Sequence, residues 1–218
     1  MTAQLEPGPT VSMALPATPA APVRWRSSVG DSLRFLKLWL RRPVSLGAVL
    51  PSGKSLALAM AGQIDPGVPG AVVELGGGTG NITAALLESG IALKDLVIIE
   101  REPTLVKLLN GRFPGARVIC GDARYMASLI EQAGVGPVKA VVSGLPMLSL
   151  PDSVCREIIA QAFLILEPDG IVVQFTYGPL SPVSRSISRD LDIVGARVDW
   201  VLDNVPPASV WNYCRRAA

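Results

Sequence analysis

Residues 72–80 combine an apolar strand, an acid and a glycine-rich turn. Glu74 is followed by glycines at alternate positions, Gly76, Gly78 and Gly80. Glycine lets a backbone turn sharply and approach a ligand closely, and the helix expected from Asn81 offers unpaired N–H groups at its start. The G-x-G-x-x-G spacing of dinucleotide-binding proteins is absent, because Thr79 and Asn81 occupy its third glycine position. The segment therefore predicts a small-molecule site, but not one for a nicotinamide dinucleotide.

Three further strand ends carry residues suited to binding a ligand. Glu100 closes an apolar strand about one crossover unit after the glycines, where an acid can accept hydrogen bonds from both ribose hydroxyls. Gly121, Asp122 and Ala123 follow the next strand. The fourth strand ends in Ser143, Gly144, Leu145 and Pro146. Open parallel sheets bind ligands at the carboxyl ends of their strands, so these segments predict a single crevice.

The acid and glycine pattern E-x-G-x-G-x-G resembles the first motif of the class I S-adenosylmethionine-dependent methyltransferases, and the resemblance extends from residue 72 to about residue 175. It implies S-adenosylmethionine as cofactor, S-adenosylhomocysteine as product and no metal. It also implies that Glu74 faces the amino acid end of the cofactor through water, and that Asp122 contacts the adenine amino group. The cofactor-binding residues expected are Glu74, Gly76, Gly78, Gly80, Glu100, Arg101, Gly121, Asp122, Ala123 and Ser143.

The composition excludes several other kinds of protein. The 218 residues contain no histidine, which removes the usual general base, the usual zinc ligand and the Ser-His and Cys-His pairs of hydrolases. Cys120, Cys155 and Cys214 form no C-x-x-C motif, so we expect reduced cysteines in small apolar sites. The net charge of +2 does not favour nucleic-acid binding. We expect no secretory signal and no membrane span, and a catalytic part in the cytoplasm.

From residue 71 onward, apolar runs rich in Val and Ile alternate with helical patterns, which is typical of an α/β fold. We expect the Rossmann-like class I methyltransferase fold, with a seven-stranded, mostly parallel sheet, an antiparallel last strand and helices on both faces. Strands are predicted over 72–75, 96–99, 116–120, 140–143, 171–175, 197–202 and 210–214. Helices are predicted over 52–63, 81–89, 103–112, 125–133, 153–166 and 184–193.

The region before this domain divides into two parts. Residues 1–22 are rich in Pro, Ala and Thr and predict a disordered tail. Residues 23–43 predict a basic amphipathic helix, and residues 44–218 the methyltransferase domain. Such a helix can lie in the surface of an anionic membrane, or alternatively pack over the cofactor with its charged face in solvent. The membrane-binding residues predicted are Arg34, Phe35, Lys37, Leu38, Trp39, Arg41 and Arg42.

Four segments, residues 38–43, 47–52, 143–146 and 205–208, resemble the bacterial phospholipid N-methyltransferases of the Pmt type. The resemblance implies methylation of phosphatidylethanolamine, in up to three steps towards phosphatidylcholine, by a peripheral protein on the inner face of the cytoplasmic membrane. Ribosomal RNA adenine dimethylases are similar, but their fourth motif reads N-L-P-Y. The corresponding segment here, Ser143 to Met147, lacks both the amide and the aromatic residue.

Methyl transfer needs an amine with a free lone pair, held in line with the methyl carbon. Tyr177 follows the fifth strand and can contact the amine or the growing cation through its ring. We therefore assign Tyr177 and Ser143 as candidate catalytic residues. Gly144, Leu145, Pro146, Tyr177, Arg185 and Lys54 are the candidate substrate-binding residues, the last two for a lipid phosphate. Trp211 and Tyr213 are expected in the core or an interface.

Two alternatives stay open. One is a nucleic-acid N-methyltransferase, which is supported by the similarity of the fourth motif to that of the ribosomal RNA adenine dimethylases. The other is a non-catalytic, membrane-associated protein that binds S-adenosylmethionine. The sequence predicts no nucleic-acid partner and leaves the oligomeric state open.

Overall fold

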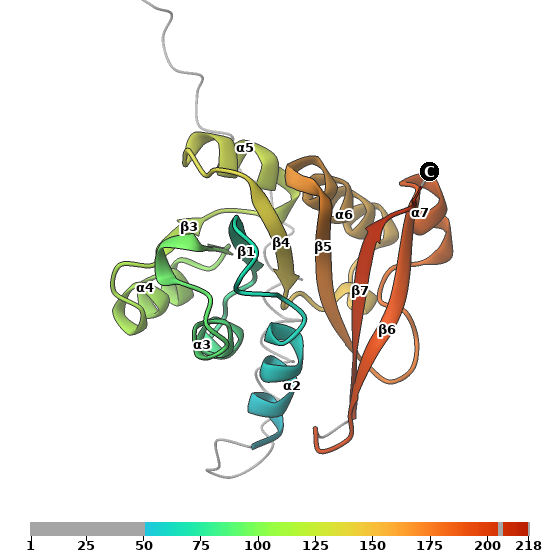
Figure 1. Ribbon diagram of the computed structural model, residues 1–218, viewed down its shortest axis with the longest axis horizontal. Helices are drawn as coiled ribbons and strands as arrows, with labels where there is room; N and C mark the ends of the chain where they lie inside the picture. The colour runs from blue at the N-terminus through green and yellow to red at the C-terminus, as the bar shows by residue number, and fades with distance from the viewer. Residues whose placement is uncertain (1–50, 205–206, 218) are drawn as a thin grey trace, which may run out of the picture. The chain divides into compact units, whose positions relative to one another are not determined.

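In the computed structural model, which describes residues 51–204 and 207–217, seven strands form one sheet in the order β3-β2-β1-β4-β5-β7-β6 (Figure 1). All pairs from β3 to β5 are parallel, and β7 runs antiparallel to both of its neighbours, β5 and β6. The strands are β1 Ala71–Leu75, β2 Leu96–Glu100, β3 Arg117–Cys120, β4 Val138–Ser143, β5 Leu166–Tyr177, β6 Ile193–Val201 and β7 Ala208–Arg215. The predicted fold class is confirmed.

Helices cover both faces of the sheet because both faces of the central strands are apolar. They are α2 Pro51–Ala61, α3 Asn81–Glu88, α4 Pro103–Arg112, α5 Met126–Gln132, α6 Asp152–Ile165 and α7 Arg185–Asp190, with short 3-10 turns η1 Leu93–Asp95, η2 Ala123–Tyr125 and η3 Met147–Ser149. Side chains alternate along a strand, so Val72 of β1 packs in the core beneath α2, α3 and α4 while Val73 packs beneath α5, α6 and α7.

Two predicted boundaries were wrong at the fifth and sixth strands. β5 begins at Leu166, five residues before the predicted start, where Leu166 pairs with Val138 of β4. Arg215 of β7 also donates hydrogen bonds to the carbonyls of Leu166 (3.1 Å) and Glu167 (2.8 Å), and such contacts between distant residues leave no local signal in the sequence. Helix α7 ends at Asp190, and β6 already begins at Ile193, where the sequence predicted helix.

The cysteines differ in their surroundings. Cys155 is buried in the core as expected, whereas Cys120 and Cys214 are exposed. None of the helices in the described part of the chain has the length and apolarity that crossing a bilayer requires. The predicted tail 1–22 and basic helix 23–43, with its membrane-binding residues, lie outside the described residues, and these domain boundaries stay predictions.

Candidate active site

Backbone hydrogen bonds join the carboxyl ends of the four strands β3, β2, β1 and β4. The N–H groups of three glycines donate across neighbouring strands: Gly121 to the carbonyl of Glu100 (3.0 Å), Gly76 to that of Ile99 (2.8 Å) and Gly144 to that of Leu75 (2.8 Å). The structure therefore brings the four sequence segments together at one edge of the sheet, which we call the carboxyl edge.

Glu74 lies wholly buried on β1, beneath the first turn of α3. Its Oε2 accepts a hydrogen bond from the hydroxyl of Thr83 (2.7 Å), while its Oε1 is buried with no partner among the described residues. Burial raises the pKa of Glu74 to about 8, against the lowering effect of the Thr83 hydrogen bonds. A buried carboxyl oxygen without a partner is rare in folded proteins, and it fits a cationic group of a cofactor or a bridging water.

Three N–H groups of the glycine turn are already hydrogen-bonded within the protein. Gly78 donates to Oε2 of Glu100 (3.0 Å) and Gly80 donates to the carbonyl of Gly77 (2.8 Å), while Gly76 bonds β2 as described above. These groups are not available to cradle a phosphate, in agreement with the failed dinucleotide spacing. Gly76 has a φ of +71°, and a Cβ there would lie 2.8 Å from the side chain of Leu145, so the turn and the fourth-strand loop are in direct contact.

Glu100 closes β2 with a carboxylate that is 7% exposed. Its Oε1 accepts the N–H of Glu102 (2.9 Å) and its Oε2 accepts that of Gly78. Each carboxylate oxygen can accept two hydrogen bonds, so one position on each remains for a pair of ribose hydroxyls. The two backbone bonds fix the orientation of the carboxylate before any ligand arrives.

Asp122 is held by two arginines. Its carboxylate accepts hydrogen bonds from Nε (3.2 Å) and an Nη (3.0 Å) of Arg124, and Arg101 lies 3.8 Å away. Burial alone would raise the pKa of Asp122, but the hydrogen bonds and charge of Arg124, with the charge of Arg101, lower it below its usual value. Ala123 follows in η2 and packs against the core. Arg101, predicted to bind cofactor, therefore lies beside the predicted adenine acid.

The loop after β4 is fixed from below by a residue that the sequence analysis missed. Gln174 of β5 is wholly buried, and its Nε2 donates to the carbonyls of Leu145 (2.9 Å) and Phe175 (2.9 Å). Its Oε1 is buried without a partner in the described structure. Ser143, its neighbour on β4, is also fully buried and accepts the N–H of Leu145 (3.3 Å). A lone polar residue in the apolar run of the fifth strand was the only sequence signal for Gln174.

Tyr177 ends β5 at the same edge and is 41% exposed. Its ring packs edge-on against Phe175, with ring centres 5.4 Å apart. Beside it, Ser209 of β7 donates to the carbonyl of Gly178 (2.7 Å) and accepts from Nε1 of Trp211 (3.0 Å), which fixes the chain after Tyr177. Trp211 thus has a structural role at the site's margin.

The structure does not bring the two predicted phosphate-binding residues to this cluster. Lys54 is exposed, and its amine pairs with Glu88 (3.2 Å) at the end of α3 that lies away from the glycine turn. After Tyr177 the chain turns back. The N–H of Val183 donates to the hydroxyl of the buried Tyr213. Tyr213 lies opposite Val172, several residues before the carboxyl end of β5. The exposed Arg185 therefore follows a segment that leads away from the carboxyl edge.

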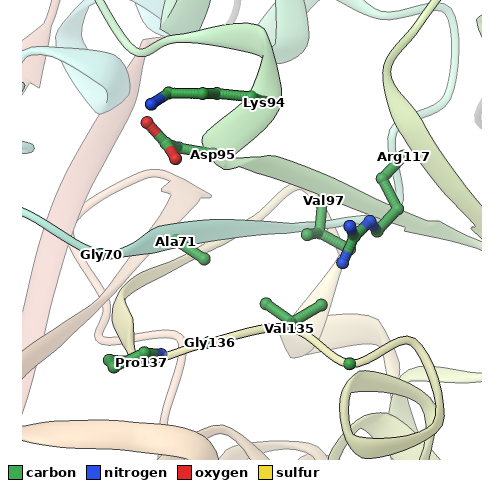
Figure 2. Close-up of a pocket in the computed structure, with 10 residues that line it drawn as sticks. Gly70, Ala71, Lys94, Asp95, Val97, Arg117, Val135, Gly136 and Pro137 are labelled. Atoms are coloured by element: carbon green, nitrogen blue, oxygen red, sulfur yellow. The ribbon is translucent and has the colours of Figure 1, made fainter.

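A cavity of about 230 Å³ lies at the opposite, amino-terminal edge of the sheet. Lys94, Asp95 and Arg117 supply its charged side chains (Figure 2). Arg117 donates to the carbonyl of Ala133 (3.0 Å), which gives it a structural partner. No residue predicted for the site lines this cavity.

Comparison with known proteins identifies the family. The chain is 30% identical to the ornithine lipid N-methyltransferase of Singulisphaera acidiphila over 190 residues, which cover 85% of this chain and 96% of that protein. The chain belongs to the class I S-adenosylmethionine-dependent methyltransferases. No protein-family model matches it. A ribosomal RNA small subunit methyltransferase A from Anaeromyxobacter is 28% identical over 202 residues, and this methyltransferase spans 63% of that protein's length.

Solved structures agree on the fold. Magnesium protoporphyrin IX methyltransferase from Synechocystis, with bound S-adenosylhomocysteine, superposes with a TM-score of 0.61 at 14% identity. The superposition covers 86% of this chain and 97% of that protein's chain. The glycopeptide N-methyltransferase MtfA, with bound S-adenosylmethionine, has a TM-score of 0.59 at 14% identity, covering 80% and 99%.

The cofactor of this methyltransferase is S-adenosylmethionine. The carboxyl edge fits this cofactor: Oε1 of Glu74 is buried with no partner among the described residues, the carboxylate of Glu100 is pre-oriented, and the N–H groups of Gly76, Gly78 and Gly80 are already hydrogen-bonded. Within residues 51–204 and 207–217, no group of three or more His, Cys, Asp or Glu side chains is placed to hold a metal ion.

Proposed function

We propose that this methyltransferase methylates the primary amine in the headgroup of a membrane lipid. The observation that carries the proposal is the 30% identity to a lipid N-methyltransferase along 96% of that protein's length. The sequence motifs favour phosphatidylethanolamine, taken through mono-, di- and trimethylated forms, as the acceptor. The Singulisphaera relative is named for ornithine lipid, whose ornithine also carries an amine. The chemistry common to both is an amine on a lipid anchored in a bilayer.

S-adenosylmethionine supplies a methyl group on a positively charged sulfur. In our proposal Glu74 and Glu100 hold the cofactor, together with the glycine turn, Asp122 and Ala123. Gly144, Leu145 and Pro146 form the wall against which the acceptor amine lies, and Ser143 and Gln174 fix that wall from below. Positioning of this kind, with exclusion of water, is the main contribution a protein makes to such a transfer.

The acceptor amine arrives as an ammonium and must lose a proton before it can react. The chain has no histidine to accept it. Tyr177 is the residue we assign to contact the amine, since its ring stands at the carboxyl edge and remains partly exposed. The face of an aromatic ring also attracts a cation, which suits an acceptor that becomes more permanently charged with each methyl group. The proton passes to water or a carboxylate at this edge.

We further propose that residues 23–43 form the basic amphipathic helix predicted above and bind an anionic membrane, so that the protein acts on the inner face of the cytoplasmic membrane. Six basic residues and one acid lie in this stretch. A surface of this charge is attracted to anionic lipid over about a Debye length.

Ribosomal RNA is the second candidate acceptor, because the Anaeromyxobacter relative acts on it according to its name. Against this stands the fourth-strand loop, in which Gly144 precedes Leu145 and Pro146 where the dimethylase motif has its amide, and Met147 follows them where the motif has its aromatic residue. Met147 is 2% exposed, so its side chain offers no surface on which a base could stack.

The deciding experiment supplies the purified full chain and methyl-labelled S-adenosylmethionine with three acceptors in parallel: phosphatidylethanolamine vesicles, ornithine lipid vesicles and ribosomal RNA. We expect label in one or both lipids and none in RNA. Label in RNA alone would contradict the proposal. Bound cofactor with no labelled acceptor would leave the non-catalytic binding protein as the explanation. The Glu88→Gln variant, changed at an exposed carboxylate on α3, serves as the unaffected control.

A further inference from the structure

Exposed apolar side chains gather at the carboxyl edge. Ten large apolar side chains are exposed in the described part of the chain, and five of them stand at or just after the carboxyl ends of strands that run in the same direction. These five are Tyr125 after β3, Leu148 after β4, Tyr177 and Leu180 after β5, and Leu202 after β6.

The topology places these loops on one side of the molecule. β3, β4 and β5 are parallel, and β6 runs in the same direction because both β5 and β6 are antiparallel to β7. Figure 1 shows β4, β5 and β6 all directed towards the side on which α2 lies. Three of the exposed leucines, Leu148, Leu180 and Leu202, follow the ends of these strands within five residues, so they stand on the side of the sheet that carries Glu100 and the loop at Gly144. Leu180 precedes the point at which the chain turns back towards Tyr213.

Hydrogen bonds hold the segments that carry these leucines, and Leu202 precedes Asp203, whose carboxylate accepts the hydroxyl of Ser55 (2.6 Å). Leu148 follows Met147, whose carbonyl accepts the thiol of Cys155 (3.1 Å). Leu180 lies between Gly178, which donates to the carbonyl of Pro207 (3.1 Å), and Ser181, whose hydroxyl bonds that of Tyr213 (2.8 Å).

These side chains are nonetheless well exposed, with Leu180 68%, Leu202 67% and Leu148 53% open to solvent. A large apolar side chain kept in water by an ordered loop loses the free energy that burial would give, and a group of them at one edge marks an interaction site. We define Leu148, Leu180 and Leu202 as the leucine rim. Tyr177 is left out because of its role at the amine, and Tyr125 because its ring lies against Arg124 (5.7 Å).

We propose that the leucine rim inserts into the surface of a lipid bilayer and holds the carboxyl edge against it during methyl transfer. The inference rests on the proposed function. A lipid whose acyl chains stay in the bilayer presents its headgroup only at the interface, so the strand ends that carry the site must face that interface. Leucines at the rim enter the apolar layer, while the polar site behind them meets the headgroups.

The amino-terminal edge offers a matched control. Leu164, near the end of α6, is 70% exposed, as open as any rim leucine, but it lies next to the start of β5 at the far edge of the sheet. A change there alters as much exposed apolar surface as one change in the leucine rim, without touching the proposed docking face.

The experiment compares the full chain with a triple variant, Leu148→Ser, Leu180→Ser and Leu202→Ser, and with Leu164→Ser. Each is assayed for S-adenosylhomocysteine binding by calorimetry, for sedimentation with vesicles of phosphatidylethanolamine and phosphatidylglycerol, and for methylation of the amine lipid both in vesicles and as dispersed short-chain monomers. We expect the triple variant to lose at least about tenfold in vesicle binding and in methylation of vesicle lipid. Its cofactor affinity and its rate on dispersed monomers should stay within about twofold of the unchanged chain, as should all values for Leu164→Ser.

Three results would overturn the inference: unchanged vesicle binding in the triple variant, an equal loss in Leu164→Ser, or a change in self-association without a change in vesicle binding, which would make the rim a protein interface. Failure of the proposed function looks different. In that case no lipid is methylated in either form by any variant, while the difference in vesicle sedimentation still reports on the rim.

Discussion

At the amino-terminal edge of the sheet, Arg117 and Lys139 find hydrogen-bond partners in the backbone, whereas at the carboxyl edge two buried oxygens have none among the described residues. Arg117, which lines the cavity, donates to the carbonyl of Ala133, and Lys139, near the start of β4, donates to the carbonyls of Asp65 (2.8 Å) and Val68. Across the sheet, Glu74 and Gln174 each keep one buried oxygen with no partner among the described residues. A cavity by itself therefore does not locate the active site of this protein. Buried polar atoms that the fold leaves unsatisfied are the better guide.

The largest effect should come from removing the carboxylate of Glu100. Glu100→Ala deletes the acceptor for two backbone N–H groups and for the proposed ribose hydroxyls. Hydrogen bonds to charged groups contribute about 1.5–3 kcal/mol each, so we expect the affinity for S-adenosylmethionine to fall by about 100-fold or more. Titration calorimetry measures it. Glu88→Ala should change the affinity less than about twofold, and a similar loss in both variants would contradict the assignment.

Glu74 should make stability depend on pH. Its pKa is raised to about 8 by burial, while the unfolded chain titrates near 4.5, so the folded state retains a proton that the unfolded state releases. The free energy of unfolding, measured without cofactor, should therefore fall as pH rises from about 4.5 to about 8, by a few kcal/mol. Glu74→Gln, which cannot ionise, should flatten this part of the curve. An equally steep fall in the variant would assign the pH dependence to another group.

Gln174→Leu should separate catalysis from cofactor binding. The change leaves the carbonyls of Leu145 and Phe175 without their buried donor, which destabilises the fold by about 1–3 kcal/mol and loosens the acceptor wall. We expect kcat to fall about tenfold, with cofactor affinity within about twofold. The matched control is Gln161→Leu on α6, where the lost bond is to the N–H of Ala127 (3.0 Å). It should lose stability but not kcat. Equal kcat values in the two variants would reduce Gln174 to a structural role.

The smallest effect is expected at the amino-terminal edge. Arg117→Ala removes a partly solvated hydrogen bond to Ala133 and a charged wall of the cavity. Stability should fall by less than about 1 kcal/mol, because exposed polar contacts contribute little. Methylation kinetics and cofactor affinity should not change. A marked loss of cofactor affinity in Arg117→Ala would indicate that the cofactor binds at the amino-terminal edge instead.

Much of the fold was predictable because its signals are local. The apolar runs of β1, β2 and β4 and the glycines after them predicted both the strands and the edge at which the site lies. The place of Glu100 at the end of β2 was predictable because the apolar run from Leu96 to Ile99 stops there. The order of these elements along the chain fixed the rest of the parallel sheet.

What could not be predicted depends on contacts between distant residues. The early start of β5 depends on the pairing of Leu166 with Val138 of β4, and Arg215, almost fifty residues away, donates to the carbonyl of Leu166. Gln174 gave only a weak signal, since its partners in the loop after β4 are known only once the strands pair. The turn of the chain away from the carboxyl edge before Arg185 depends on Tyr213 in the core. The pairing of Lys54 with Glu88 could not be predicted either, because it joins residues of two helices that are far apart in the sequence.

The most direct test of the contrast between the two edges is hydrogen exchange of the full chain with and without S-adenosylhomocysteine, followed by mass spectrometry. The account predicts slower exchange in peptides covering residues 74–83, 100–102, 121–125 and 143–147, with little change at 94–97, 117 and 134–137. Protection confined to the second set would contradict it, because the ligand would then occupy the cavity at the amino-terminal edge.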